Sequence, residues 1–128
     1  MSKWKAHYYT TDDGVCELSD YLDSISSGNR KKVLAWITML EEKGPTLPRP
    51  FADLLEDGIH ELRVKLSGEQ TRVLYFFVFQ ERIILTHSFT KKSKAVPISE
   101  IVRAKNFRKD FKRRYASIED LDASSKGR

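Results

Sequence analysis

The sequence has very few of the residues from which disulfides and metal sites are built. Cys16 is the only cysteine among 128 residues, so no disulfide can form within the chain, and a reducing, cytoplasmic setting is expected. Histidines, cysteines and carboxylates show no spacing typical of metal ligands, and there is no glycine-rich phosphate loop. We therefore expect a protein that works without a metal ion or another cofactor.

Long apolar runs are also missing. The longest run, Val73 to Phe79, has the length of a strand, whereas a membrane-spanning helix needs about 20 apolar residues. The beginning of the chain has no apolar segment of the signal-peptide type. We expect no membrane association. Apolar residues still make up 40% of the chain, enough for one core, and we expect a single domain over residues 1–115.

Charge is present in abundance and is unevenly distributed. The net charge is +5, but residues 59–114 carry 14 lysines and arginines against 5 acidic residues, a balance of +9. Residues 1–58 carry 7 against 10, a balance of −3. A basic half indicates a polyanion or an acidic protein as partner. Part of the excess is also explained by a charged, solvated helix near the end of the chain.

The hydrophobic pattern predicts an α+β fold with the order β-α-α-β-β-β-α. We expect a small antiparallel sheet with helices packed on one face. Residues 116–128 are small and polar, and we expect a flexible tail there. The remaining expected elements are a strand at 4–9, helices at 12–25 and 29–43, a connector at 45–57, strands at 59–66, 71–79 and 82–89, and a helix at 97–114.

Alternation along the strand at 59–66 separates its side chains into two faces. His60, Leu62, Val64 and Leu66 share the expected core face, whereas Ile59, Glu61, Arg63 and Lys65 share the other, mainly polar face. A guanidinium on a strand stands on a stiff platform, where it can be directed at a phosphate. The polar face therefore favours a site that acts on RNA.

Three stretches of sequence resemble one known family. They are LEEKGPTLPRPFADLLEDGIHELRV, TRVLYFFV and ILTHSFTKKSKAVPISEIVRAKNFRKDF, which occur in this order on the expected elements. Together they resemble the RelE/ParE superfamily of bacterial toxins, in its HigB-like, phage-derived host-killing branch. The resemblance covers residues 3 to 113 and implies a RelE-like fold.

The resemblance also implies a function and partners. Such toxins belong to type II toxin–antitoxin systems, and most are metal-independent endoribonucleases that cut mRNA, commonly on the ribosome, and so inhibit translation and arrest growth. The partner is an antitoxin from the adjacent gene, in this branch often a helix-turn-helix protein, and we expect a toxin–antitoxin heterotetramer. The superfamily also contains ParE-like toxins that inhibit DNA gyrase without cutting RNA. A module that only binds nucleic acid is a third alternative.

Two arginines are the first candidates for the catalytic site. Arg72 matches the arginine of the family's "yRvlY" strand and is expected to bind the scissile phosphate through a forked pair of hydrogen bonds. The alternative is a strand-end arginine paired with Glu61 or Glu69. Arg63 matches the arginine of the family's "ELR" and is expected to stabilise phosphate charge, or else to form an ion pair with Glu61.

Candidates for proton transfer follow along the third strand of the meander. Lys91 and Lys92 come directly after it and are expected to grip a backbone phosphate or to donate a proton; solvated loop lysines are the alternative. His87 is a second acid or base candidate, but its alternation with Ile83 and Leu85 favours a buried histidine on the core face. The sequence has no obvious C-terminal catalytic tyrosine or histidine, which leaves the general acid open. Further RNA contacts are expected from Lys65, Lys94, Arg103 and Lys105.

Overall fold

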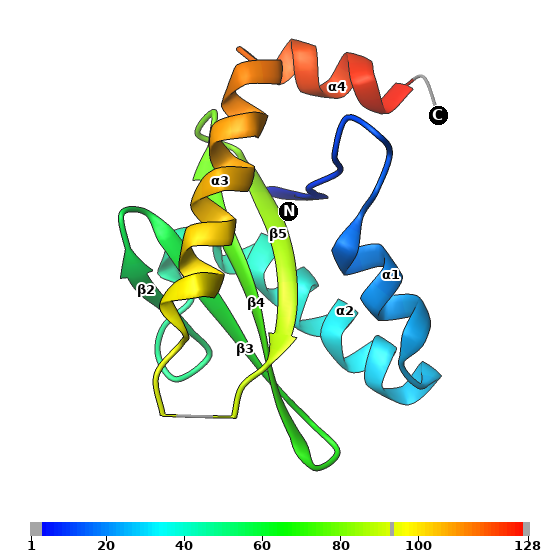
Figure 1. Cartoon of the computed structure of the whole chain (residues 1–128), viewed down its shortest axis with the longest axis vertical. Coiled ribbons are helices and arrows are strands. Elements are labelled where there is room, and N and C mark those ends of the chain that lie inside the picture. The colour runs from blue at the N-terminus through cyan, green and yellow to red at the C-terminus, as the bar shows by residue number, and fades with distance from the viewer. Residues whose placement is uncertain (1–3, 93, 127–128) are drawn as a thin grey trace.

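The computed structural model describes residues 4–92 and 94–126. Its elements are β1 (Lys5–Tyr8), α1 (Glu17–Ser24), α2 (Ser27–Lys43), the 3-10 turn η1 (Gly44–Thr46), β2 (Ala52–Glu56), β3 (Ile59–Leu66), β4 (Glu69–Val78), β5 (Arg82–Thr90), α3 (Ile98–Arg114) and α4 (Ile118–Lys126). Figure 1 shows α3 lying in front of the strands, α2 behind them and α1 to the right of the sheet. The α+β class predicted from the sequence is confirmed.

The five strands form one sheet in the order β1-β5-β4-β3-β2. The three strands of the meander and β2 pair in antiparallel fashion, but β1 pairs with β5 in parallel. The expectation of a purely antiparallel sheet is therefore wrong at one edge. The physical reason is that the helical hairpin α1–α2 carries the chain across the sheet between β1 and β2, so β1 occupies the far edge.

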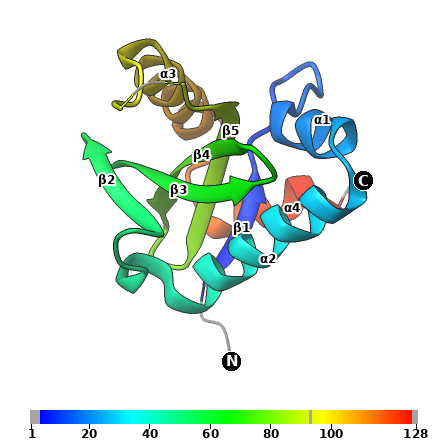
Figure 2. The same ribbon diagram turned by 90° about the horizontal axis from the view of Figure 1, so that it is seen from below.

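Both faces of the sheet are covered by helices, not one face as the sequence predicts. Val73 and Tyr75 of β4 pack in a cluster with residues of α1 and α2. Leu74 and Phe76, the alternate residues of the same strand, pack in a second cluster with Ala104 of α3. Figure 2 shows the two layers of helix on opposite sides of the strands. The uninterrupted apolar run in β4 follows from burial on both faces.

The expected connector contains an additional strand. Residues 52–56 form β2, which pairs with the first half of β3 and places Asp53 opposite Glu61. The strand follows three prolines, is five residues long and exposes Leu54 to solvent. Its alternation is therefore too short and too weak to be recognised in the sequence. β2 pairs with β3 only as far as Leu62, so among the described residues the remainder of β3 has no paired strand on that side.

The expected polar tail contains a helix. Residues 118–126 form α4, and Leu121 is buried in the cluster that contains Tyr9 and Phe111. The hydroxyl of Ser117 accepts a hydrogen bond from the backbone N–H of Asp120 and so caps the first turn. The buried Leu121, the serine cap and the ion pair between Arg82 and Asp122 attach this helix to the domain, so residues 118–126 form a regular element where the sequence indicates a flexible tail. None of the described helices is long and apolar enough to span a bilayer.

Candidate functional site

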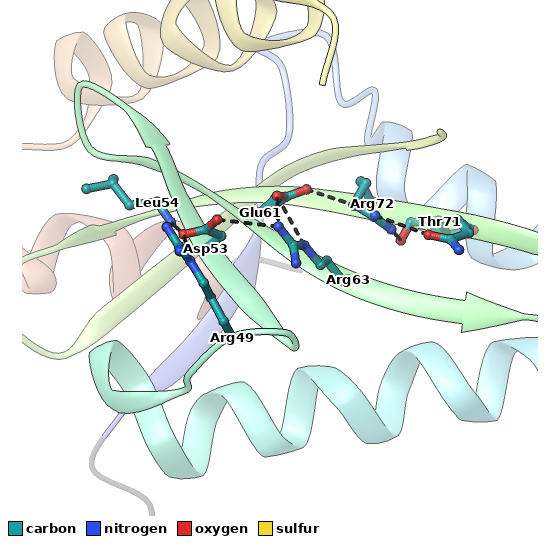
Figure 3. A network of polar contacts seen from close by, with 8 residues as sticks. Arg49, Asp53, Leu54, Glu61, Arg63, Thr71 and Arg72 are labelled. Atoms are coloured by element: carbon teal, nitrogen blue, oxygen red, sulfur yellow. Dashed lines mark hydrogen bonds and ion pairs between the residues drawn. The ribbon is translucent and has the colours of Figure 1, made fainter. Parts of the chain in front are cut away.

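The candidate site is centred on two arginines that face each other across adjacent strands. Arg63 of β3 and Arg72 of β4 are direct partners in the antiparallel register. Their strand parity places them on the same face of the sheet as Leu74, which packs in the cluster that contains Ala104 of α3. Figure 3 shows the two side chains with the acidic residues that hold them. Like charges placed opposite each other repel, so this pair requires a counter-charge.

Glu61 supplies that counter-charge to both arginines. Its Oε1 accepts a hydrogen bond from Nε of Arg72 at 2.9 Å, and its Oε2 accepts from Nε and Nη2 of Arg63 at 3.2 and 3.0 Å. The side chains of Glu61 and Arg72 are only 3% and 6% exposed. A carboxylate this deeply buried is tolerated because it is fully paired. The sequence places Glu61 on an outward face, but the structure places it inside the protein.

The two arginines differ in accessibility. Arg72 also donates to the backbone oxygen of Thr71 and to the side-chain oxygen of Gln70, so its guanidinium is held on three sides. The side chain of Arg63 is 30% exposed. Its bonds to Glu61 and Asp53 use Nε and Nη2, and within the described residues Nη1 has no partner. Arg63 is therefore the arginine that can reach a bound anion directly.

The network continues outward through β2. Asp53 accepts from Nη2 of Arg63 at 3.4 Å and from Nε of Arg49 at 3.0 Å. The hydrogen bond from Arg49 holds the pKa of the Asp53 carboxyl below its ordinary value, with smaller contributions from the Leu54 N–H and from Arg63. The network thus joins three guanidinium groups to two carboxylates and retains one excess positive charge.

A cleft of about 530 Å³ opens beside the arginine pair. It lies where β3 extends past β2, and its walls come from α2, from the loop before β2 and from the β3–β4 hairpin. Among the side chains that line it are Lys32, Trp36, Phe51, Arg63, Lys65 and Arg72. Four of these six side chains are cationic. The cleft is therefore lined both by cationic side chains and by two aromatic rings.

The lysines after β5 lie at the same end of the sheet. The backbone N–H of Lys91 donates to the backbone oxygen of Gln70 at 2.7 Å, which places Lys91 in register with Gln70. Gln70 also accepts from Arg72 through its side chain, so one residue ties the start of the lysine loop to the arginine pair. Lys92 and Lys94 are exposed. Ser93 between them lies outside the described residues.

His87 is fully buried on the α3 face of the sheet. A bulge in β5 pairs Leu74 with His87 and Tyr75 with Leu85, which leaves Thr86 as the additional residue. The bulge reverses the alternation, so the prediction that His87 shares a face with Leu85 is wrong, although burial itself is as the alternation suggests.

Both ring nitrogens of His87 have partners. Nε2 lies 3.0 Å from Oε1 of Glu100 in α3, and Nδ1 lies 3.0 Å from the hydroxyl of Thr86. Burial lowers the pKa of His87, an effect that the hydrogen bond to Glu100 partly opposes. With 0% of its surface exposed, His87 cannot touch a substrate in this conformation.

Two further residues expected to bind RNA are engaged in ion pairs. Arg103 of α3 pairs with Glu17 of α1 and with Glu100, and its guanidinium lies over the ring of Phe107. Lys105 pairs with Glu56 of β2. The same helix contains Arg108, Arg113 and Arg114, which pair with Asp57, Asp12 and Asp110. Much of the positive charge of α3 is thus used to attach this helix to the rest of the domain.

Several members of the site are not recognised in the sequence. Trp36 and Phe51 follow apolar patterns and are assigned to the core, and Lys32 and Asp53 carry no motif. These residues are brought together only by the sheet edge, which depends on the unpredicted β2. A partial signal exists in the spacing of Glu61 and Arg63, which are two residues apart on one strand face. Within the described residues, no group of three or more histidine, cysteine or acidic side chains is placed to hold a metal ion.

The chain matches a known protein family. A family model described as "Phage derived protein Gp49-like (DUF891)" matches residues 20–109. The matched segment runs from α1 to α3 and so includes Arg63, Arg72 and the cleft beside them. No curated protein matches the chain significantly.

Proposed function

The chain belongs to the Gp49-like family of phage-derived proteins, a toxin-like family, and on this premise we propose that it is the toxin of a type II toxin–antitoxin system. The proposed activity is that of a metal-independent mRNA endoribonuclease that associates with the ribosome and inhibits translation. The observation that supports the proposal is the arginine pair, which one buried carboxylate holds in register and of which Arg63 is partly exposed beside the cleft.

RNA cleavage requires little from a protein beyond position and charge. The 2′-hydroxyl of the substrate is the nucleophile, and it must be aligned with the phosphorus atom and lose a proton. Negative charge then develops on the phosphoryl oxygens, and preorganised donors in a water-poor site stabilise it best. The leaving 5′-oxygen must gain a proton. Arginines and lysines on a stiff sheet can meet three of these requirements, which are alignment, charge stabilisation and protonation of the leaving oxygen. The proton of the 2′-hydroxyl passes to solvent water.

In this proposal Arg63 contacts the scissile phosphate and Arg72 supports it. Arg63 presents Nη1 on an exposed side chain. Arg72 is buried behind it and adds a fixed positive charge that Glu61 holds in place. Because the carboxylate also fixes Arg63 through two nitrogens, neither guanidinium has to reorganise as charge develops on the phosphate. In this proposal the phosphate contact expected from Arg72 is made by Nη1 of Arg63.

The lysine loop is the proposed source of the proton for the leaving oxygen. Lys91 is the first choice, because its backbone bond to Gln70 brings it beside Arg72. Lys92 and Lys94, together with Lys65, provide exposed positive charge for the RNA backbone on either side. His87 is assigned a positioning role, since it attaches Glu100 at the beginning of α3 to the sheet and does not reach the cleft.

The antitoxin is proposed to neutralise this basic surface. Residues 59–114 carry an excess of nine positive charges, and the cleft exposes lysines from β3 and α2. An acidic segment placed across the cleft would satisfy these cations and exclude RNA at the same time. We propose that this partner is encoded next to the toxin and carries a DNA-binding domain of its own.

The test is controlled expression in bacteria with three readouts. Growth, RNA 5′ ends across the transcriptome and plasmid supercoiling are measured after induction. The proposal predicts growth arrest with new 5′ ends at defined codon positions and unchanged supercoiling. Growth arrest with altered supercoiling and no new 5′ ends would contradict the nuclease and indicate a gyrase-directed toxin instead.

A further inference from the structure

We propose that Trp36 and Phe51 form a nucleobase-binding subsite on the wall of the arginine cleft, and that this subsite positions single-stranded RNA by stacking on one base. The inference rests on the proposed nuclease function and adds how the substrate is held. Two observations carry it: the aromatic pair is partly exposed, and it shares one cleft with four cationic side chains.

The two rings form a preorganised ledge. Their centroids lie 5.0 Å apart with an interplanar angle of 26°. Trp36 is anchored in α2 and packs against the core cluster below the sheet. Phe51 precedes β2, and its backbone oxygen accepts a hydrogen bond from the N–H of Arg63 at 2.8 Å. That bond couples the ledge to the strand that carries the proposed phosphate ligand.

The ledge has a free surface. Phe51 is 40% exposed and Trp36 is partly exposed, although both are large apolar side chains that are normally buried. Because Trp36 also packs against the core cluster, Phe51 offers the larger free ring surface. Aromatic surfaces of this kind accept any base, because every base has a π-face.

The charges around the ledge favour a nucleotide over a protein segment. Lys32, Lys65, Arg63 and Arg72 line the same cleft. An apolar helix on the rings would bury the ammonium groups of Lys32 and Lys65, which form no ion pair within the described residues, and this is costly. A nucleotide brings both components at once, a base for the rings and a phosphate for the cations. The volume of about 530 Å³ lies within the range typical of small-ligand sites.

The geometry implies a preference among bases. Stacking strength increases with the area of ring overlap, and sequence preferences of single-strand binders arise largely from stacking. We therefore expect purines to bind more tightly than pyrimidines at this subsite. The preference applies to one nucleotide beside the scissile phosphate, because the ledge is fixed to β3 next to Arg63.

Tryptophan fluorescence tests the subsite directly. The chain has two tryptophans, so a Trp4→Phe background leaves Trp36 as the only indole. The probes are single-stranded 2′-O-methyl oligonucleotides of adenine or uracil, which lack the nucleophile, and an abasic oligomer with the same number of phosphates. We expect the adenine oligomer to quench Trp36 more strongly than the uracil oligomer, and the abasic oligomer to bind without quenching.

Matched variants separate stacking from folding and from charge. Phe51→Ala should weaken binding of the adenine oligomer by between about 5-fold and about 100-fold. Leu34→Ala, on an exposed apolar residue of the same helix, should leave it unchanged. Trp36→Phe keeps a ring on the core and should weaken adenine binding less than Phe51→Ala does.

Three results would overturn the subsite. In the first, Phe51→Ala binds the adenine oligomer with wild-type affinity, the oligomer does not quench Trp36, and mRNA is still cut. This result would contradict the subsite and leave the proposed nuclease function standing. Loss of antitoxin binding in Phe51→Ala with unchanged oligonucleotide binding would assign the ledge to a protein partner. If the protein binds no oligonucleotide and cuts no mRNA, the proposed function falls and the subsite falls with it.

Discussion

Arg63 and Arg72 lie directly opposite each other on β3 and β4, and the carboxylate of Glu61 hydrogen-bonds to both. Two like charges in register would destabilise a hairpin. Here they persist because a buried carboxylate lies between them. The carboxylate that stabilises this pair also fixes a positively charged site beside the cleft.

The first prediction concerns Glu61. Glu61→Gln keeps the size of the side chain but removes the charge, which leaves Arg72 buried without a counter-ion. Breaking a buried pair in this way typically lowers the free energy of unfolding by about 3–5 kcal/mol. Urea denaturation measures the loss. Glu69→Gln, on an exposed residue of the same hairpin, is the control and should change stability little; equal stabilities of the two variants would show that Glu61 is not essential to the network.

The second prediction concerns the salt dependence of RNA binding. Lys65 is exposed beside the cleft, whereas Arg103 and Lys105 are paired with acidic residues. Replacing Lys65 by glutamine should reduce the slope of log affinity against log salt by about 0.7, the value for one phosphate contact on a single strand. The same change at Lys105 should leave the slope unaltered. A reduced slope in the Lys105 variant would show that α3 is part of the RNA-binding surface.

The third prediction concerns pH and His87. Burial lowers the pKa of His87 from its ordinary value of 6.5, so the unfolded chain takes up a proton there before the folded protein does. The free energy of unfolding should therefore fall as the pH is lowered through 6.5. His7 and His60 have pKa values lowered by burial as well and act in the same direction.

The contribution of His87 can be isolated by comparing two proteins. His87→Gln should have a shallower dependence of stability on pH between 7 and 5, by at most about 1.4 kcal/mol per pH unit. Chemical denaturation at several pH values gives the two curves. Parallel curves for wild type and variant would show that His87 does not change its protonation on unfolding.

The fourth prediction concerns α4. Leu121 is buried against the cluster on the α3 face, so Leu121→Ala should lower the free energy of unfolding by about 2–4 kcal/mol. Glu119→Ala, on an exposed residue of the same helix, is the matched control. If both variants unfold at the same denaturant concentration, α4 adds nothing to the stability of the domain.

The features predicted well from the sequence are those with strong local signals. The three strands at 59–89 and the helices at 17–43 and 98–114 have clear periodicity, and they appear close to the expected positions. β2 and α4 lack this signal because each has only one or two buried apolar residues. Their formation depends on tertiary partners, Leu62 for β2 and the Tyr9–Phe111 cluster for α4.

The candidate site was predictable only in part, for a related reason. Strand parity places Arg63 and Glu61 on one face, but parity cannot tell which part of that face a helix will cover. Burial of Glu61 and Arg72 accompanies the polar network that joins them to Arg63 and Gln70, which forms only when the strands are paired. The reversed parity of His87 follows from a one-residue bulge at Thr86, which leaves no mark in the hydrophobic pattern.

The most direct test of the account is the rate at which Arg63→Ala cuts mRNA in a reconstituted translation reaction. Arg63 is preferable to Arg72 for this purpose, because truncating the buried Arg72 would remove one of the two arginines that compensate the buried Glu61 and would lower the stability of the protein. Lys109→Ala removes one exposed charge from α3 and serves as the charge-matched control. The account predicts that Arg63→Ala stays folded and cuts about 10²–10³-fold more slowly than wild type, whereas Lys109→Ala cuts at the wild-type rate. A folded Arg63→Ala protein that cuts as fast as wild type would contradict the claim that Arg63 contacts the scissile phosphate.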